Sequence, residues 1–514
     1  MHPVIQEPSD QGQHPAVDSC RSEAAPQDGI LSCSQLKWIV TTLLVYFAGR
    51  LLFFATAISP FVPPDEVSHF GRSLAFSNYL LLPADSPGSF QFGLVTHIPF
   101  LYYWLMGKLL LLNFFGCSDL VFLRLLNIPL AFGTIYFAWR LLRLLTQDRL
   151  AQILLITALT NTLMFSFVSA SVSYDNLTNL LAAMAIYYLF AFLKNRSGTM
   201  LAASILCQLA GCLTKNTFLP LVLILNALLL VHEIKRLRLF PWALKGWSQV
   251  SRGRAIALSL AILVGLMLNL QLYGGNYLRY KTLNPEMFDV LPLEQALNYR
   301  LAARAYILNQ FKEGRISVQK AREMAVTYVN HPGDRSDTIG LVESYAYLEN
   351  HKEQMFGPFS YAAIWMLQMM GSTFGIKAHL GMMNYGITFL PLAVLMLLTM
   401  VAFGVRWRPR PWETAWLPSY LAAIVAFYGC LLMYLNYGVY LENRDPGLTV
   451  AGRYILPIIG TIYVLSSHYL LRLFTGRRVR LGVWLTALLI FIVSDFPFFL
   501  SRVTPQWFTW NLPK

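Results

Sequence analysis

The residues Phe61–Phe70, FVPPDEVSHF, place two carboxylates and a histidine directly after the first long apolar run. One carboxylate, Asp65 or Glu66, could act as a general base toward an attacking hydroxyl or amine. Glu66 and His69 are three residues apart, share a helix face, and could instead hold a divalent metal ion. A structural interpretation is also open, because Pro64 followed by two acids is typical of a helix N-terminus.

Other polar residues lie at the ends of apolar runs and could join the same site. Asp175, in SVSYDNLTNLL, reads either as a helix cap or as a second carboxylate. The cations are Arg72, Lys215 in LTKNTFLP, and Arg453 in GRYILP. Fixed cations near the headgroup level suit a phosphate or pyrophosphate on a lipid carrier. Alternatively, they extend to lipid headgroups or pair with the nearby acids.

Composition sets the class of protein that must position these residues. The chain has 514 residues, of which 56% are hydrophobic and 13% charged, which predicts an all-α polytopic membrane protein. The net charge of +14 is typical of cytoplasmic loops rich in Lys and Arg, and we expect no nucleic-acid partner. The six cysteines are not spaced as a disulfide framework.

Eleven apolar runs are long enough to cross about 30 Å of hydrocarbon. They cover 38–58, 121–143, 150–170, 177–194, 199–214, 217–233, 255–273, 382–404, 413–436, 454–473 and 481–499. A twelfth run, 97–116, is expected to form a juxtamembrane helix that lies along the surface. With a cytoplasmic N-terminus, this arrangement gathers the basic loop clusters on the cytoplasmic side, as the positive-inside rule requires.

Those clusters are Arg140, Arg143, Arg149, Lys194, Arg196, Lys235, Arg236, Arg238, Lys245, Arg252, Arg254, Arg406, Arg408, Arg410, Arg472, Arg477, Arg478 and Arg480.

Four regions follow from this pattern. We expect a disordered cytoplasmic tail without a signal peptide at 1–36, an N-terminal transmembrane catalytic module at 37–272, an external helical insert at 273–380, and a C-terminal transmembrane module at 381–514. The first external loop belongs to the catalytic module.

The acids near the membrane collect at the outward ends of the spans, and the span interiors contain essentially none. An ion-coupled transporter needs ionisable or unwound sites near the midplane, whereas an enzyme that works at the outer face would place its acids at the outward ends. The distribution therefore favours an enzyme.

Several motifs resemble those of the GT-C superfamily of integral-membrane glycosyltransferases, which includes protein O-mannosyltransferases and the aminoarabinose transferase of lipid A. The motifs are PPDEVSHF, the H-x-P segment at His97, the run from Arg124 to Pro129, SVSYDNLTNLLAA, LTKNTFLP and GRYILPIIG. They are closest to a largely uncharacterised bacterial branch, and the resemblance covers residues 38 to 500. The insert is the part least like the family.

The resemblance implies inverting transfer of a sugar from a polyprenyl-phosphate-linked donor to an envelope acceptor, a glycan, lipid or protein, at the outer face of a bacterial inner membrane. It implies Asp65 as the base with Glu66 beside it, and Asp175 as the second acid. Lys215 and Arg453 would contact the carrier phosphate.

The substrate-binding residues that we expect are His69, Arg72, His97, Lys215, Arg453 and Tyr454. A divalent cation held by Asp65, Glu66, His69 or Asp175 is one interpretation, and the cofactor is otherwise unknown. A transporter or flippase of lipid-linked saccharide is the alternative function, and a scaffold for envelope assembly is a third.

Overall fold

The computed structural model describes residues 31–235, 250–329, 332–379, 381–383, 386, 388–406 and 412–510. These residues form helices and loops, apart from one isolated bridge between Ala378 and Gly381. The expected all-α architecture is therefore confirmed. The predicted tail falls outside the described residues up to position 30, and the first helix begins at Cys33, where Ser32 caps it with Gln35.

Nine helices or continuous helix pairs of the described residues are long and apolar enough to cross a membrane. They are α1 (Cys33–Ala57), α4 (Asp119–Leu145), α7 (Tyr174–Asn195), α9 (Leu219–Lys235), α11 with α12 (Arg252–Asn269 and Gly275–Tyr280), α19 (Phe389–Arg406), α20 (Trp412–Asn443), α21 (Leu456–Leu470) and α22 with α23 (Arg477–Val493 and Phe496–Arg502).

Two further predicted spans take a different form. The run 150–170 is broken into α5 (Arg149–Thr160) and α6 (Leu163–Ser169), which meet at an angle of 63°. The run 199–214 forms α8 (Gly198–Thr214), a 17-residue apolar helix. All eleven predicted ranges thus fall on apolar helices, and the chain is a multi-pass membrane protein.

The run 97–116 does not form a span. Its only helix, α3 (Leu101–Leu110), has 10 residues and is therefore about 15 Å long, half of the hydrocarbon thickness. It packs against α2 (Glu66–Ser77), which begins within the PDEVSH motif and carries its last four residues, EVSH. The run therefore forms a short helix that is no span, and its position along the membrane surface stays a prediction.

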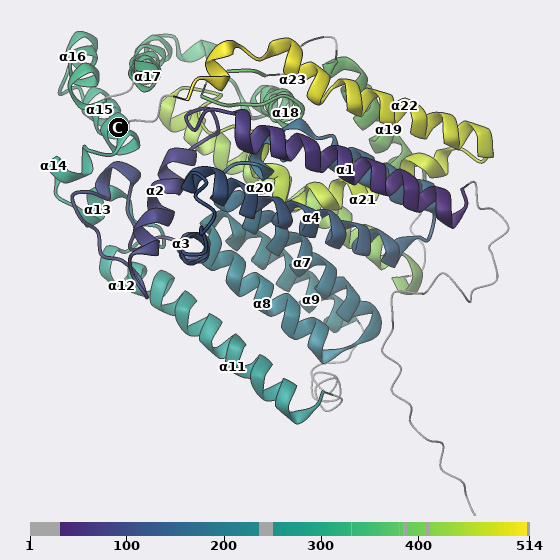
Figure 1. The fold of residues 1–514 in the computed structure, drawn as a ribbon. Helices are drawn as coiled ribbons and strands as arrows, with labels where there is room; N and C mark the ends of the chain where they lie inside the picture. Colours follow the sequence, from purple (N-terminus) through teal and green to yellow (C-terminus); the bar gives the residue numbers. More distant parts are fainter. Residues whose placement is uncertain are drawn as a thin grey trace, which may run out of the picture.

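The insert is helical and carries a small core of its own. It contains α13 (Met287–Val290), α14 (Leu293–Ala296), α15 (Arg300–Lys312), α16 (Val318–Tyr328), α17 (Pro332–Asn350) and α18 (Pro358–Phe374). Helices α15, α16 and α17 pack together through buried residues that include Ala303, Ile307 and Val342. In Figure 1 the helices α13 to α17 lie together at one end of the bundle.

Helices α7 and α21 form the centre of the bundle. The most apolar 18-residue stretches of the spans that contain them are 78% and 72% buried, whereas the corresponding stretch of α11–α12 is 6% buried. In Figure 1 α11 runs along one edge of the bundle. The apolar surface of α11 is therefore available to lipid, and α7 and α21 hold the elements that carry the polar groups described below.

The two ends of the bundle differ in charge. Among the predicted site residues, Asp175 lies in the first turn of α7 and Lys215 directly follows α8. Arg453 and Tyr454 lie in the turn before α21. The basic clusters lie at the opposite helix ends, for example Arg143 in the last turn of α4 and Lys194 in the last turn of α7. Arg236, Arg238, Lys245, Arg408 and Arg410 lie outside the described residues.

One premise of the sequence analysis is wrong. Arg50 lies inside α1, seven residues or about 10 Å before its end, and it forms an ion pair with Asp495. Both side chains are buried, and Arg50 also donates to the carbonyl of Thr160 at the α5–α6 break. The interiors of the spans therefore do contain a charged pair and an unwound segment. The pairing was not visible because 445 residues separate its partners.

Candidate active site

Asp65 connects three parts of the chain. It precedes α2 with a left-handed backbone (φ 59°), a conformation that Asp adopts more readily than most residues. Its Oδ1 accepts from Arg300 Nη2 of α15 at 2.8 Å, and its Oδ2 accepts from Arg453 Nη2 at 2.6 Å. One guanidinium thus comes from the insert and the other from the C-terminal helices.

Both guanidinium groups act on the pKa of Asp65. Burial alone would raise the pKa of its carboxyl group, but the charges of Arg453 and Arg300 outweigh burial and hold the pKa well below its usual range. Asp65 is therefore ionised throughout the neutral range, and its basicity depends on whether both arginines stay in place.

Glu66 lies in a different environment, although it is the next residue. Arg124 of α4 donates to both of its oxygens, Nε to Oε1 at 2.8 Å and Nη2 to Oε2 at 2.5 Å, and both side chains are fully buried. The backbone N–H of Val172 donates to Oε1 as well. Arg124 also donates to the carbonyls of Ala55 and Ile58 at the end of α1.

Asp175 pairs with Lys215, whose Nζ donates to Oδ1 at 2.5 Å. The cap of α7 is Ser173, whose hydroxyl accepts from the backbone N–H of Asp175, so Asp175 is not the capping residue. Lys215 Nζ also lies 4.7 Å from the ring centre of Tyr174 and 5.0 Å from that of Tyr454. Both members of this ion pair are buried.

His69 is buried between the two carboxylates and two tyrosines. Its Nδ1 lies 2.9 Å from the hydroxyl of Tyr103, and that hydroxyl also accepts from Arg72 Nη1 at 3.1 Å. The ring packs edge-on against Tyr174 at 4.4 Å. Burial lowers the pKa of His69 to about 3, so the imidazole is neutral at physiological pH.

Three donor nitrogens of this cluster have no hydrogen-bond partner among the described residues: Arg72 Nε, His69 Nε2 and Arg453 Nε. A buried donor without an acceptor costs about 1–3 kcal/mol. His69 and Arg453 lie near the two carboxylates, and Arg72 lies beside His69 and Tyr103. An oxygen-rich ligand would satisfy such donors.

His97 lies apart from this hydrogen-bonded cluster. Its Nδ1 lies 3.0 Å from Asn276 Oδ1, and Asn276 donates back to the carbonyl of His97. Its Nε2 lies 3.4 Å from the hydroxyl of Tyr280. These hydrogen bonds link His97 to α12. Within the described part of the chain, its hydrogen bonds go to Asn276 and Tyr280 and not to Asp65 or Asp175.

The sequence analysis missed three residues that organise the site. Arg124 was noted only as part of a motif, and Tyr103 was not predicted for the site. Arg300 carried no signal, because its place beside Asp65 depends on how the insert folds back over the bundle. The sole local hint was that Arg300 opens a helix without any acidic residue in its first turn.

The side chains present do not fit a divalent metal ion. Within the described residues, no three His, Cys, Asp or Glu side chains gather at metal-binding distance. Both oxygens of Glu66 are taken by Arg124, and each oxygen of Asp65 is taken by an arginine. We therefore derive no step through a metal ion.

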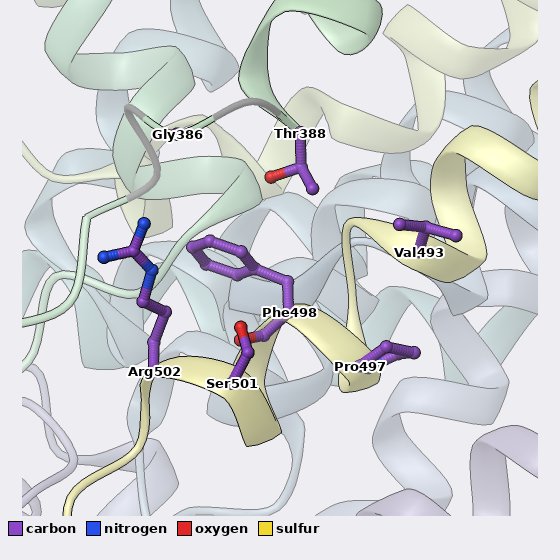
Figure 2. Close-up of a pocket in the computed structure, with 7 residues that line it drawn as sticks. All are labelled: Gly386, Thr388, Val493, Pro497, Phe498, Ser501 and Arg502. Carbon is purple, nitrogen blue, oxygen red and sulfur yellow. The ribbon is translucent and has the colours of Figure 1, made fainter.

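A pocket of about 210 Å³ lies elsewhere, between α22–α23 and the segment before α19. Figure 2 shows the ring of Phe498 between Arg502 and Thr388. The remaining lining residues are Gly386, Val493, Pro497 and Ser501. None of the residues that line this pocket was predicted for the site.

Comparisons with known proteins give relatives by structure. No family model matches the chain, and neither does any curated protein. Among solved structures, it is similar to ArnT from Cupriavidus metallidurans in the apo state, at 14% identity over 85% of this chain and 78% of that chain, with a TM-score of 0.35. The structure of the same enzyme bound to undecaprenyl phosphate is 15% identical over 86% of this chain and 78% of that chain, with a TM-score of 0.35.

A third similar structure is the archaeal oligosaccharyltransferase AglB from Archaeoglobus fulgidus, in complex with an inhibitory peptide and a dolichol-phosphate. The identity is 12% over 89% of this chain and 55% of that chain, and the TM-score is 0.42. ArnT and AglB are both GT-C superfamily members, the superfamily that the sequence motifs resemble. At TM-scores of 0.35 to 0.42, no residue of this chain takes a role from them.

Proposed function

We propose that this protein is an inverting membrane glycosyltransferase that moves a sugar from a polyprenyl-phosphate-linked donor to an envelope acceptor. The acceptor is a glycan, a lipid or a protein. The reaction takes place at the outer face of a bacterial inner membrane, and Asp65 is the general base.

The observation that carries this proposal is the polar cluster at one end of the bundle. Two carboxylates, Asp65 and Asp175, lie among Arg453, Lys215 and His69, and Arg453 and His69 each retain a buried donor without an acceptor. A phosphate group offers several anionic acceptor oxygens and would satisfy these donors. The carboxylates then face the bond to be broken.

Charge at the bundle ends supports the orientation. The basic clusters lie at the helix ends opposite this cluster, and Lys- and Arg-rich ends face the cytoplasm. The cluster would therefore face outward, where a lipid-linked sugar is presented after it has crossed the membrane.

The chemistry balances without a further reactant. The acceptor hydroxyl attacks the anomeric carbon, and the bond between that carbon and the phosphate oxygen breaks. The electron pair leaves with the phosphate, whose charge Lys215 and Arg453 stabilise. The proton of the hydroxyl passes to Asp65. Attack from the side opposite the leaving phosphate inverts the anomeric configuration.

Arg300 must move for this step to occur. A carboxylate held by two guanidinium groups is a weak base, because both stabilise its ionised form. Arg453 belongs to the bundle and Arg300 to the insert. We propose that acceptor binding at the insert draws Arg300 away from Oδ1 and so raises the basicity of Asp65.

The remaining expected residues divide between binding and structure. Glu66 serves to hold α2 against α4 through Arg124, which leaves Asp65 as the base. The ring of Tyr454 lies against the ammonium group of Lys215, which we propose contacts the phosphate of the sugar donor. His97 positions α12 through Asn276. The module 37–272 then supplies catalysis, and the insert at 273–380 meets the acceptor.

A flippase or transporter of lipid-linked saccharide is the second candidate. The buried Arg50–Asp495 pair beside the α5–α6 break favours it, because unwound, charged positions at this depth are typical of transport sites. Transport without transfer would leave the outer carboxylates dispensable.

The direct test is sugar transfer by purified protein in lipid nanodiscs, with a panel of radiolabelled sugar-linked polyprenyl phosphates and envelope extract as the acceptor. We expect release of free polyprenyl phosphate and labelled product. Lys215→Gln combined with Asp175→Asn, which leaves no unpaired buried charge, should weaken donor binding at least about tenfold.

Lys320→Gln is the matched control, because Lys320 is an exposed cation in a surface pair with Glu323. Protein that binds the lipid and releases no labelled product with any sugar would contradict a transferase and favour the flippase. Equal donor binding by the double variant and the control would remove Lys215 from the donor site.

A further inference from the structure

A chain of hydrogen bonds fixes which nitrogen of His69 carries the proton. Arginine can only donate, so the hydroxyl oxygen of Tyr103 accepts from Arg72. The single hydrogen of that hydroxyl needs an acceptor, because Tyr103 is 1% exposed. Within the described part of the chain, its other hydrogen-bond partner is His69 Nδ1.

One protonation state of His69 leaves the fewest buried polar groups without a hydrogen-bond partner. If Nδ1 accepts from Tyr103, the neutral ring carries its proton on Nε2, and one donor is left without a partner. If Nδ1 carried the proton, both the Tyr103 hydroxyl hydrogen and the Nε2 lone pair would be left over. A doubly protonated ring would bury a charge, and burial lowers the pKa of His69 to about 3.

The unpartnered Nε2–H lies in the middle of the polar cluster. His69 is 2% exposed, and it lies within electrostatic range of Asp65, Asp175 and Arg453. The carboxylate oxygens accept from other groups: Arg300 and Arg453 donate to those of Asp65, and Lys215 and Ser173 donate to those of Asp175. Within the residues that the structure describes, this buried donor therefore has no acceptor at hydrogen-bond distance.

We propose that His69 donates its Nε2–H to an oxygen of the lipid-linked sugar, and that Tyr103 and Arg72 are positioning residues that fix its tautomer. This rests on the proposed function. The oxygen belongs either to the phosphate or to a sugar hydroxyl, since both are acceptors. The same tautomer has no lone pair at Nε2, so His69 cannot bind a metal ion through that nitrogen.

Two amide substitutions separate this role from a structural one. In His69→Gln the amide nitrogen can occupy the position of Nε2, so the donor to the substrate is retained and the contact with Tyr103 is lost. In His69→Asn the amide lies near the position of Nδ1, so the contact with Tyr103 is retained and the donor is lost. If His69 acts only through its contact with Tyr103, His69→Asn should bind the lipid more tightly than His69→Gln does. If it acts as a donor to the substrate, His69→Gln should bind more tightly.

The assay measures binding of two probes in nanodiscs, undecaprenyl phosphate and the same lipid carrying a sugar. We expect His69→Asn to bind the sugar-linked lipid about 10-fold to 100-fold more weakly than wild type, and His69→Gln to retain most of the affinity. Equal weakening of both probes identifies a phosphate oxygen, and weakening of the sugar-linked lipid alone identifies a sugar hydroxyl. Affinity that is unchanged in His69→Asn, or lower in His69→Gln, overturns the proposal.

A second readout does not depend on the lipid. Nitrogen-15 spectra of histidine-labelled protein, with the His69 signals assigned by their loss in His69→Gln, should show a neutral ring protonated on Nε2 at pH 7. Tyr103→Phe should convert part of the population to the other tautomer. A charged ring, or a proton on Nδ1 in wild type, contradicts the inference. If the spectra agree and neither lipid binds, the proposed function fails.

Discussion

At the scale of single residues, the neighbouring acids Asp65 and Glu66 differ in burial and in the arginines that they pair with. Asp65 is partly exposed and is held from two sides by arginines that belong to separate parts of the chain. Glu66 is fully buried and is held by one arginine through two bonds. The proposed mechanism requires the first arrangement to open, because Arg300 must leave Asp65. The second joins three helices, because Arg124 of α4 bonds to Glu66 of α2 and to carbonyls at the end of α1.

The buried pair should be needed for stability. Arg124→Ala leaves the Glu66 carboxylate buried without its partner, and we expect a loss of about 3–5 kcal/mol, seen as a lower melting temperature in detergent. Arg315→Ala, which removes an exposed pair with Glu313, is the control and should cost at most about 1 kcal/mol. Similar melting temperatures for the two variants would show that the Glu66–Arg124 pair does not hold α2.

The pH dependence of transfer should show how far the neighbouring arginines lower the pKa of Asp65. Its pKa lies below the usual value of about 4, so in wild type the acid limb of kcat/KM should lie below pH 4. Arg300→Gln removes one stabilising charge, the pKa rises, and the acid limb should move to higher pH.

Arg322→Gln provides the comparison for that shift, because Arg322 pairs with Glu343 on the surface of the insert. Its acid limb should match wild type. An acid limb that stays in place in Arg300→Gln would show that the insert does not control Asp65.

At the scale of elements, the segment before α21 places Arg453. This turn, Gly452–Ile455, lies directly on α18: a Cβ at Gly452 would come within 2.4 Å of the backbone nitrogen of Thr373. The N–H of Gly452 donates to Ser372 Oγ, and Lys377 donates to the carbonyls of Gly447 and Val450. The position of Arg453 therefore depends on close backbone packing.

Gly452→Ala should displace this turn and move Arg453 away from Asp65. We expect transfer to fall at least about tenfold and the melting temperature to drop, as for overpacking of a filled contact. Gly438→Ala in α20 is the matched control, since a Cβ there meets nothing within 4 Å, and it should leave both unchanged. Full activity in Gly452→Ala would mean that the turn can shift without moving Arg453.

The sequence predicted elements better than contacts, for a physical reason. A span needs about 20 apolar residues in a row, and such a run is visible without knowledge of the fold. The break between α5 and α6 was missed because Asn161 and Thr162 lie inside a run that reads as continuous. Asp65, His69, Asp175, Lys215 and Arg453 were predicted as site residues because they flank apolar runs, and their roles stay a prediction.

Contacts between distant residues could not be predicted. Arg124 is 58 residues from Glu66, Arg300 is 235 residues from Asp65, and Arg453 is 388 residues from Asp65. Three features of the fold bring them together: the contact of α2 with α4, the position of α15 beside Asp65, and the turn before α21 that carries Arg453. The role of Asp175 as a cap was likewise open until Ser173 was seen to occupy the capping position.

At the scale of the whole molecule, the polar cluster and the basic helix ends define two faces. Ser118 precedes α4 on the cluster side and Ser251 precedes α11 on the basic side, and both are exposed. In a cysteine-free background, which is needed because Cys117 is itself exposed, Ser118→Cys should react with an impermeant maleimide on intact cells. Ser251→Cys should react only after permeabilisation. Labelling of Ser251→Cys from outside would invert the topology.

The central claim is that Asp65 takes the proton during transfer, and single-turnover transfer by Asp65→Asn tests it most directly. The account predicts a loss of about 10²-fold to 10⁴-fold in rate, with the melting temperature and undecaprenyl phosphate binding close to wild type. Glu66→Gln should instead lower stability. Wild-type transfer rates in Asp65→Asn would contradict the account.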